Sequence, residues 1–223
     1  MCGRFVQSAS ADDYARYFGA DAIKTERLEA NYNVAPTDRV YAVAEHDEQR
    51  LIGSFSWGLI PHWSKDRRQA ARFINARMES LVDKAAFRDA FRTRRCIVPA
   101  DGFYEWTRRG DFKIPHLIFD GTHAPLALAG LWSSWKDPDG GEWVRSCSIV
   151  TTRPNEFMRP IHDRMPAVLP EAAWDAWLDR DNQDVEQLRS LLGPPPETLL
   201  ETYEVSTEVN NVRNNGPELI MPV

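Results

Sequence analysis

Short runs of strand-forming residues, separated by turn signals, most constrain how this chain can fold. We expect strands at Val40–Ala44, Leu51–Trp57, Cys96–Pro99, Phe103–Thr107, His116–Phe119, Leu126–Leu131, Trp143–Val150, Leu199–Val205 and Glu218–Met221. These runs outnumber the helical segments and do not alternate regularly with them, which argues against a doubly wound parallel sheet. The pattern predicts an α+β fold with a mainly antiparallel, curled sheet, a β-barrel-like core and short peripheral helices.

The helical segments are few and short. We expect helices at Ala11–Phe18, Lys84–Phe91, Pro170–Leu178 and Asn182–Gly193. Ser10 is a capping residue for the first of these, and Gly19 is a typical helix end. The sequence Asp-Pro-Asp-Gly-Gly at 137–141 is a turn signal that predicts a hairpin between two strands.

The length and composition exclude several classes of protein. A chain of 223 residues with 43% hydrophobic side chains suits a single domain spanning residues 1–223. No run of 18 apolar residues and no apolar signal core occur, so we expect a cytoplasmic protein without a membrane partner. The three cysteines are an odd number without a C-x-x-C pair, so we expect no disulfide framework. The five histidines are scattered without metal-ligand spacing, so we expect no metal, and we expect no cofactor.

The charge is distributed unevenly along the chain. The formal net charge is −6, yet residues 65–113 contain 13 Lys and Arg against 7 Asp and Glu. Such a basic stretch in an acidic protein can attract phosphate groups. The alternative is a solvated basic face that is balanced by neighbouring acids.

Cys2 is the first candidate for chemistry. Methionine is commonly removed before a small second residue, which would leave Cys2 with a free α-amine beside its thiol. Both groups are partly nucleophilic near neutral pH, and an N-terminal nucleophile can use its own amine as a base. Together they can trap an aldehyde, first as a Schiff base and then as a thiazolidine ring. The alternative is a buried structural cysteine in a strand, a common role of free cysteine.

Polar residues inside apolar runs give further candidates. If residues 74–79 are extended, Asn75 and Arg77 lie on the same side. In residues 99–106, Glu105 is flanked by aromatic residues, which tend to raise a carboxyl pKa towards the range useful for acid–base catalysis. Alternatively, Asn75 satisfies loop backbone groups and Glu105 forms an ion pair with an arginine.

Two more segments combine suitable side chains. His162, Asp163 and Arg164 lie together in an irregular segment, where a structural, hydrogen-bonded histidine is the alternative to a catalytic one. Trp63 lies beside the basic stretch, where it could either stack on nucleic-acid bases or pack into the core.

Several unusual sequence blocks occur together and in order along the chain. They are MCGRF at 1–5, NYNVAPT at 31–37, WGLIPHW at 57–63, INARMES at 74–80, CIVPADGFYEW at 96–106, SIVTT at 148–152, IHDRMP at 161–166 and NVRNNGPELIMPV at 211–223. With these blocks, the chain resembles the SOS-response-associated peptidase (SRAP) family of abasic-site processing proteins over essentially its whole length.

The resemblance implies a single SRAP domain that recognises abasic sites in single-stranded DNA during the DNA damage response. It implies an autocatalytic cysteine peptidase that removes Met1, crosslinks covalently to DNA and has abasic-site lyase activity. Cys2 would form a thiazolidine with the ring-opened deoxyribose, Asn75 would position its amine, and Glu105 and His162 would transfer protons.

The same motifs imply two groups of DNA-binding residues. The phosphate ligands, with a neighbouring threonine, would be Arg4, Arg77, Thr151 and Arg164. The apolar surface on which bases stack would be Pro36, Trp63 and Trp106. Arg213 would add a backbone contact. We expect a monomer that is cytoplasmic and associates with the nucleoid when bound to damaged DNA.

Two other functions use the same residues. In an N-terminal-nucleophile peptidase or amidohydrolase, Cys2, Asn75 and His162 would serve acyl transfer on other substrates. In a non-catalytic single-strand-binding module, Cys2 would be structural, and DNA binding would be unchanged by Cys2→Ala.

Overall fold

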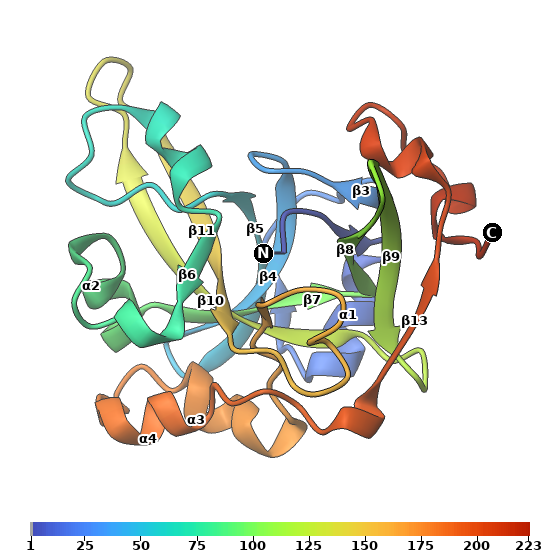
Figure 1. Cartoon of the computed structure of the whole chain (residues 1–223). Coiled ribbons are helices and arrows are strands. Elements are labelled where there is room, and N and C mark those ends of the chain that lie inside the picture. The colour runs from blue at the N-terminus through green and yellow to red at the C-terminus, as the bar shows by residue number, and fades with distance from the viewer. Residues whose placement is uncertain (1) are drawn as a thin grey trace.

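The computed structural model describes residues 2–223, and within them five long strands close into a barrel (Figure 1). These strands are β4 (Arg39–His46), β5 (Gln49–Trp57), β7 (Arg95–Ala100), β10 (Leu126–Lys136) and β11 (Trp143–Thr152). Their order is β11-β10-β7-β4-β5, with antiparallel neighbours. A parallel pairing of β11 with β5, which matches Cys147 with Trp57, closes the ring.

Three short strands pair with β5 and β11 of the barrel. β2 (Ala22–Ile23) pairs with β5, whereas β6 (Asn75–Arg77) and β12 (Met165–Pro166) pair with β11. β6 runs parallel to β11, with Asn75 opposite Ile149 and Arg77 opposite Thr151. The segments that contain Asn75 and His162 are therefore both held beside the end of β11.

A second, antiparallel sheet lies beside the barrel. It consists of β13 (Leu200–Glu204), β9 (Phe112–Asp120), β8 (Gly102–Arg109), β1 (Phe5–Gln7) and β3 (Asn31–Val34), in that order. β1 pairs with β8 through Phe5 and Phe103. This pairing holds the N-terminal segment between the second sheet and the interior of the barrel, where Cys2 and Phe5 pack with Trp57.

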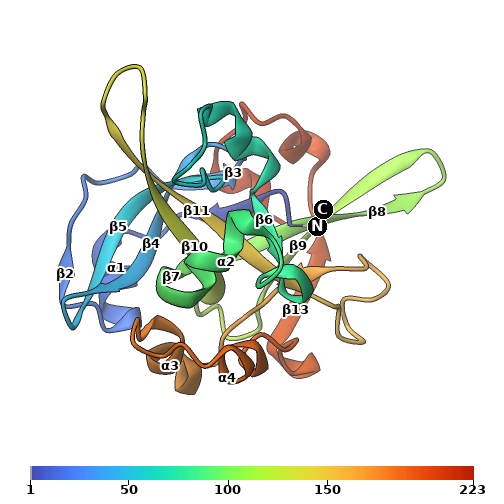
Figure 2. The same ribbon diagram turned by 90° about the vertical axis from the view of Figure 1, so that its left-hand side faces the viewer.

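Short helices cover the outside of the barrel. They are α1 (Ala11–Phe18), α2 (Ala85–Thr93), α3 (Trp174–Leu178) and α4 (Val185–Ser190), and α3 and α4 lie side by side in Figures 1 and 2. Single 3₁₀ turns occur at Arg67–Arg72, Met78–Ser80, Glu171–Ala173, Glu197–Leu199, Thr207–Asn210 and Pro217–Ile220. Alternate residues of β4 belong to two hydrophobic clusters. Val40 and Ala42 face the barrel interior, whereas Tyr41 and Val43 pack towards the helices.

The α+β class with a curled, mainly antiparallel sheet is confirmed. The hairpin turn at 137–141 joins β10 to β11 as expected, and Trp174 and Trp177 are buried. α1 has the predicted bounds, because Ser10 accepts a hydrogen bond from the Asp13 backbone and Gly19 takes the left-handed conformation, with φ of 62°.

Other element predictions are wrong. Residues 218–221 form no strand; Pro217–Ile220 is a 3₁₀ turn, because proline at the first position favours a helical start. The helix expected at 182–193 is only Val185–Ser190, since Asp184 caps it. The helix expected at 170–178 is a 3₁₀ turn followed by the short α3.

Within residues 2–223, no helix combines the length and apolar character needed to cross a bilayer.

Candidate active site

Cys2 and Asn75 are joined by a direct hydrogen bond. Nδ2 of Asn75 donates to the carbonyl oxygen of Cys2 at 2.7 Å. Because β6 is anchored on β11, this bond fixes the backbone of Cys2 relative to the barrel. The Cys2 side chain is 0% exposed in the chain that carries Met1, and its Sγ lies 3.8 Å from the carbonyl oxygen of Arg4.

Glu105 lies in β8 and faces the barrel interior. Its neighbours alternate as the sequence predicts: Phe103 packs in the barrel cluster, and Tyr104 and Trp106 pack on the other face. The Glu105 side chain is only 3% exposed, and burial raises its pKa to about 7. Burial also raises the pKa of the Cys2 thiol well above its usual range, and the charge of Glu105 raises it further.

His162 lies beside Glu105, in the loop between β11 and β12. Its Nε2 is 3.9 Å from Oε2 of Glu105, and its Nδ1 accepts a hydrogen bond of 3.0 Å from the backbone N–H of Arg164. Oδ1 of Asp163 also lies 2.8 Å from Nδ1. Burial lowers the pKa of His162.

Arg4 and Trp106 form one wall of the site. The Arg4 guanidinium donates to Oδ1 of Asn33 at 2.7 Å and to the carbonyl of Val209 at 2.8 Å, and lies 5.9 Å from the centre of the Trp106 ring. The indole N–H of Trp106 donates to Oδ1 of Asn210 at 2.7 Å. These contacts hold an arginine and an aromatic face together, a combination that suits a phosphate and a base.

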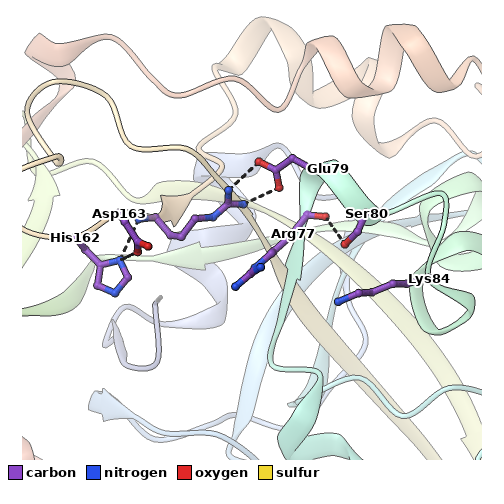
Figure 3. Close-up of a pocket in the computed structure, with 7 residues that line it drawn as sticks. Arg77, Glu79, Ser80, Lys84, His162 and Asp163 are labelled. Atoms are coloured by element: carbon purple, nitrogen blue, oxygen red, sulfur yellow. Dashed lines mark hydrogen bonds and ion pairs between the residues drawn. The ribbon is translucent and has the colours of Figure 1, made fainter.

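Arg164 is held by a carboxylate on the opposite wall. Its two terminal nitrogens contact the two carboxylate oxygens of Glu79 at 2.7 and 3.0 Å (Figure 3). One of them also donates to the Thr151 carbonyl at 2.7 Å. Thr151 is fully buried, so it contacts Arg164 and not the surface. Arg77 is exposed at the end of β6, beside this pair.

Two open cavities meet at His162. One, of about 640 Å³, is lined by Arg77, Glu79, Ser80, Lys84, His162, Asp163 and Arg164 (Figure 3). The other, of about 620 Å³, is lined by Arg4, Glu105, Trp106, Arg108, Lys113, His162 and Asn210. Lysines and arginines outnumber carboxylates in this lining, so positive charge lies on both sides of His162.

Some predicted DNA-binding residues lie elsewhere. Pro36 is half-buried after β3, and Trp63 is 51% exposed in the segment after β5. Arg213 is exposed near the C-terminus. Neither cavity is lined by any of these three residues, so their DNA contacts stay predictions.

The basic stretch at residues 65–113 contains both cavity-lining and buried side chains. Lys84, Arg108 and Lys113 line the cavities, and sequence reasoning did not single them out, although all three lie within residues 65–113. Arg95 is instead 2% exposed and donates to backbone carbonyls around α2 and α3. The stretch therefore contains both cavity-lining and buried structural side chains.

The described residues 2–223 contain no group of three or more His, Cys, Asp or Glu side chains arranged to hold a metal ion. Cys2, Cys96 and Cys147 are all free and buried. The side chains gathered at this site are a cysteine, an amide, a carboxyl group and an imidazole.

The barrel thus buries a cysteine near a buried carboxyl group, beside an amide and an imidazole. The family model for the SOS response associated peptidase (SRAP) matches residues 1–212, and the chain belongs to this family. The fold is shared as well: a crystal structure of a protein from Bacteroides thetaiotaomicron matches with a TM-score of 0.89, 27% identity and 100% coverage of both chains.

Curated relatives have a common description. The abasic site processing protein YoqW of Bacillus subtilis is 41% identical over 222 residues, which is 99% of each chain. The abasic site processing protein YedK of Escherichia coli is 33% identical and covers 100% of both chains. The abasic site processing protein HMCES of Xenopus tropicalis is 30% identical over 89% of this chain and 68% of its own.

Proposed function

We propose that this protein processes abasic sites in single-stranded DNA and forms a covalent adduct with them through Cys2. The observation that carries the proposal is the grouping of Cys2 with Asn75, which it contacts, and with Glu105, whose charge acts on its thiol, beside the Glu105–His162 pair that lines the cavities. The names of the relatives support abasic-site DNA as the substrate.

The first step is removal of Met1. Hydrolysis of the peptide bond between Met1 and Cys2 consumes one water, releases methionine and leaves a free α-amine on Cys2. We propose that the protein catalyses this step itself. The thiol is held protonated by burial, so it needs a base, and the Glu105 carboxylate, with a pKa of about 7, is suited to that role.

The second step is capture of the ring-opened sugar. The amine of Cys2 adds to the aldehyde carbon and water leaves, which forms a Schiff base. The thiol sulfur then adds to the same carbon, and its proton is transferred to the nitrogen, which closes a thiazolidine. Overall, one aldehyde and one aminothiol react to give one thiazolidine ring and one molecule of water. When the sulfur does not add, the Schiff base allows β-elimination, which is the lyase activity.

The surrounding residues have distinct proposed roles. The Asn75 hydrogen bond holds Cys2 so that its nitrogen keeps one position after Met1 is removed. Glu105 and His162 supply and accept the protons for sugar opening and loss of water. Arg4, Arg77 and Arg164 bind phosphates, while Thr151 positions Arg164, and Trp106 stacks on a base.

Intact-protein mass spectrometry, with and without an abasic oligonucleotide, tests the proposal. We expect loss of one methionine, and then a denaturation-resistant adduct that Cys2→Ala abolishes. Cys2→Ser should lose the thiazolidine and retain strand cleavage. Cys147→Ala, which removes another buried free cysteine, is the matched control and should still form the adduct.

The alternatives give different results. An adduct of equal yield with Cys2→Ala would refute the role of Cys2. Hydrolysis of peptide substrates that is indifferent to DNA, without any adduct, would favour a peptidase acting on other substrates.

A further inference from the structure

The β8–β9 hairpin leads directly from the candidate active site to the surface. β8 carries Glu105 near its middle and ends at Arg109, and β9 begins at Phe112, which is 74% exposed. Figure 2 shows this hairpin projecting from the body of the protein. The outer part of the hairpin is an exposed two-stranded ribbon that belongs to none of the hydrophobic clusters.

One face of the ribbon pairs two positive charges. Arg108 lies directly opposite Lys113 in the antiparallel register, and both side chains are exposed. Like charges in this arrangement destabilise a sheet. Among residues 2–223, neither side chain forms an ion pair with a carboxylate, so the repulsion is not offset within the described chain.

The other face of the ribbon is different. Arg109, the next residue, contacts the carboxylate of Glu204 in β13. Three arginine and lysine side chains therefore lie at one hairpin tip, but only Arg109 is neutralised. The unpaired charges of Arg108 and Lys113 lie on the side that lines the cavity with Trp106 and His162.

We propose that Arg108 and Lys113 form a phosphate-binding site for the DNA strand on one flank of the abasic site. This inference rests on the proposed function. Arg108 is three residues from Glu105, or about 10 Å along an extended strand, so it reaches a neighbouring nucleotide and not the lesion itself. Lys84, in the cavity on the other side of His162, serves the opposite flank.

The test uses two oligonucleotides, one with nucleotides only 5′ of the abasic site and the other with nucleotides only 3′ of it. The rate of adduct formation is measured against DNA concentration for wild type and the double variant Arg108→Ala/Lys113→Ala. We expect the half-saturating concentration to rise at least tenfold for one oligonucleotide and less than twofold for the other, with the saturating rate kept. Lys84→Ala should show the reverse preference.

Arg109→Ala is the matched control, because it removes the same charge from the other face of the same hairpin, and it should leave both curves unchanged. Loss of two phosphate contacts should also lower the slope of log affinity against log salt by about 1.4 for unmodified single-stranded DNA. All four substitutions are at exposed positions, and equal melting temperatures will verify that the variants fold.

Equal losses with both oligonucleotides, or no loss with either, would overturn the hairpin site while the wild-type adduct still forms. A wild-type protein that forms no adduct with either oligonucleotide would instead refute the proposed function. An unchanged salt slope for the double variant on unmodified DNA would refute the hairpin site in that case too.

Discussion

At the scale of single residues, the environment of Glu105 decides what the site can do. A glutamate in water is ionised at neutral pH, whereas burial in the barrel raises the pKa of this one to about 7. His162 beside it is made less basic by the same burial. A carboxyl group with a pKa near neutrality is suited to general acid–base catalysis.

The raised pKa of Glu105 predicts a pH-dependent stability. The folded state holds the proton more tightly than the unfolded state, so this group lowers the unfolding free energy as pH rises from about 4.5 to about 7. Glu105→Gln removes the effect. We expect its stability relative to wild type to rise by about 2.5 kcal/mol between pH 5 and pH 8, measured by urea unfolding. Parallel pH profiles for the two proteins would contradict the burial argument.

At the scale of elements, β11 assembles the site from segments that are distant in sequence. β6 pairs along one edge of β11, and the loop before β12 returns to the same strand end. Arg164 from that loop meets Glu79 from the turn after β6. The carboxylate occupies the guanidinium face that a phosphate would use, and Arg164 lowers the pKa of Glu79.

Glu79→Gln tests this competition. The amide keeps one hydrogen bond to Arg164 but removes the negative charge, so we expect binding to single-stranded DNA to tighten about fivefold, or about 1 kcal/mol. Fluorescence anisotropy titration at low salt measures the change, and Glu186→Gln, which removes an exposed charge paired with Arg189 in α4, is the control. Weaker binding of Glu79→Gln would mean that the carboxylate is needed to orient Arg164.

At the scale of the whole molecule, the positive charges are divided between structure and surface. The net charge is −6, yet the cavities around His162 are lined by six lysines and arginines against three carboxylates. Arg95 belongs to the same basic stretch but is buried between β7, α2 and α3, where it donates to the carbonyls of Phe91, Arg92, Trp177, Asp179 and Asn182.

Arg95→Met should therefore affect stability and not DNA binding. The methionine keeps much of the packing of the side chain, but several buried carbonyls lose their donor, so we expect a loss of about 3 kcal/mol in unfolding free energy. Thermal unfolding measures this loss, and the exposed Arg92→Met in α2 is the control. If the folded variant also lost the salt dependence of DNA binding, Arg95 would belong to the DNA-binding surface.

Local signals in the sequence were sufficient for much of the fold and for part of the site. Alternation in β8 places Phe103 and Glu105 on one face, and capping residues set both ends of α1. The short strands β1, β3 and β6 went unpredicted, because their pairing partners stabilise them more than their own composition does. The motif at 211–223 contains a strand-like run that proline at position 217 directs into a 3₁₀ turn.

By itself, the sequence determined the α+β class and the family, because strand periodicity, turn signals and motif blocks are local properties, and it predicted which residues bear the chemistry. Only the tertiary structure decided which charges line the cavities, which side chain contacts Cys2 and how strongly Glu105 holds its proton. Burial and cross-strand neighbours depend on contacts between residues far apart in the chain, as those between Asn75 and Cys2 illustrate. A local pattern contains no information about such distances.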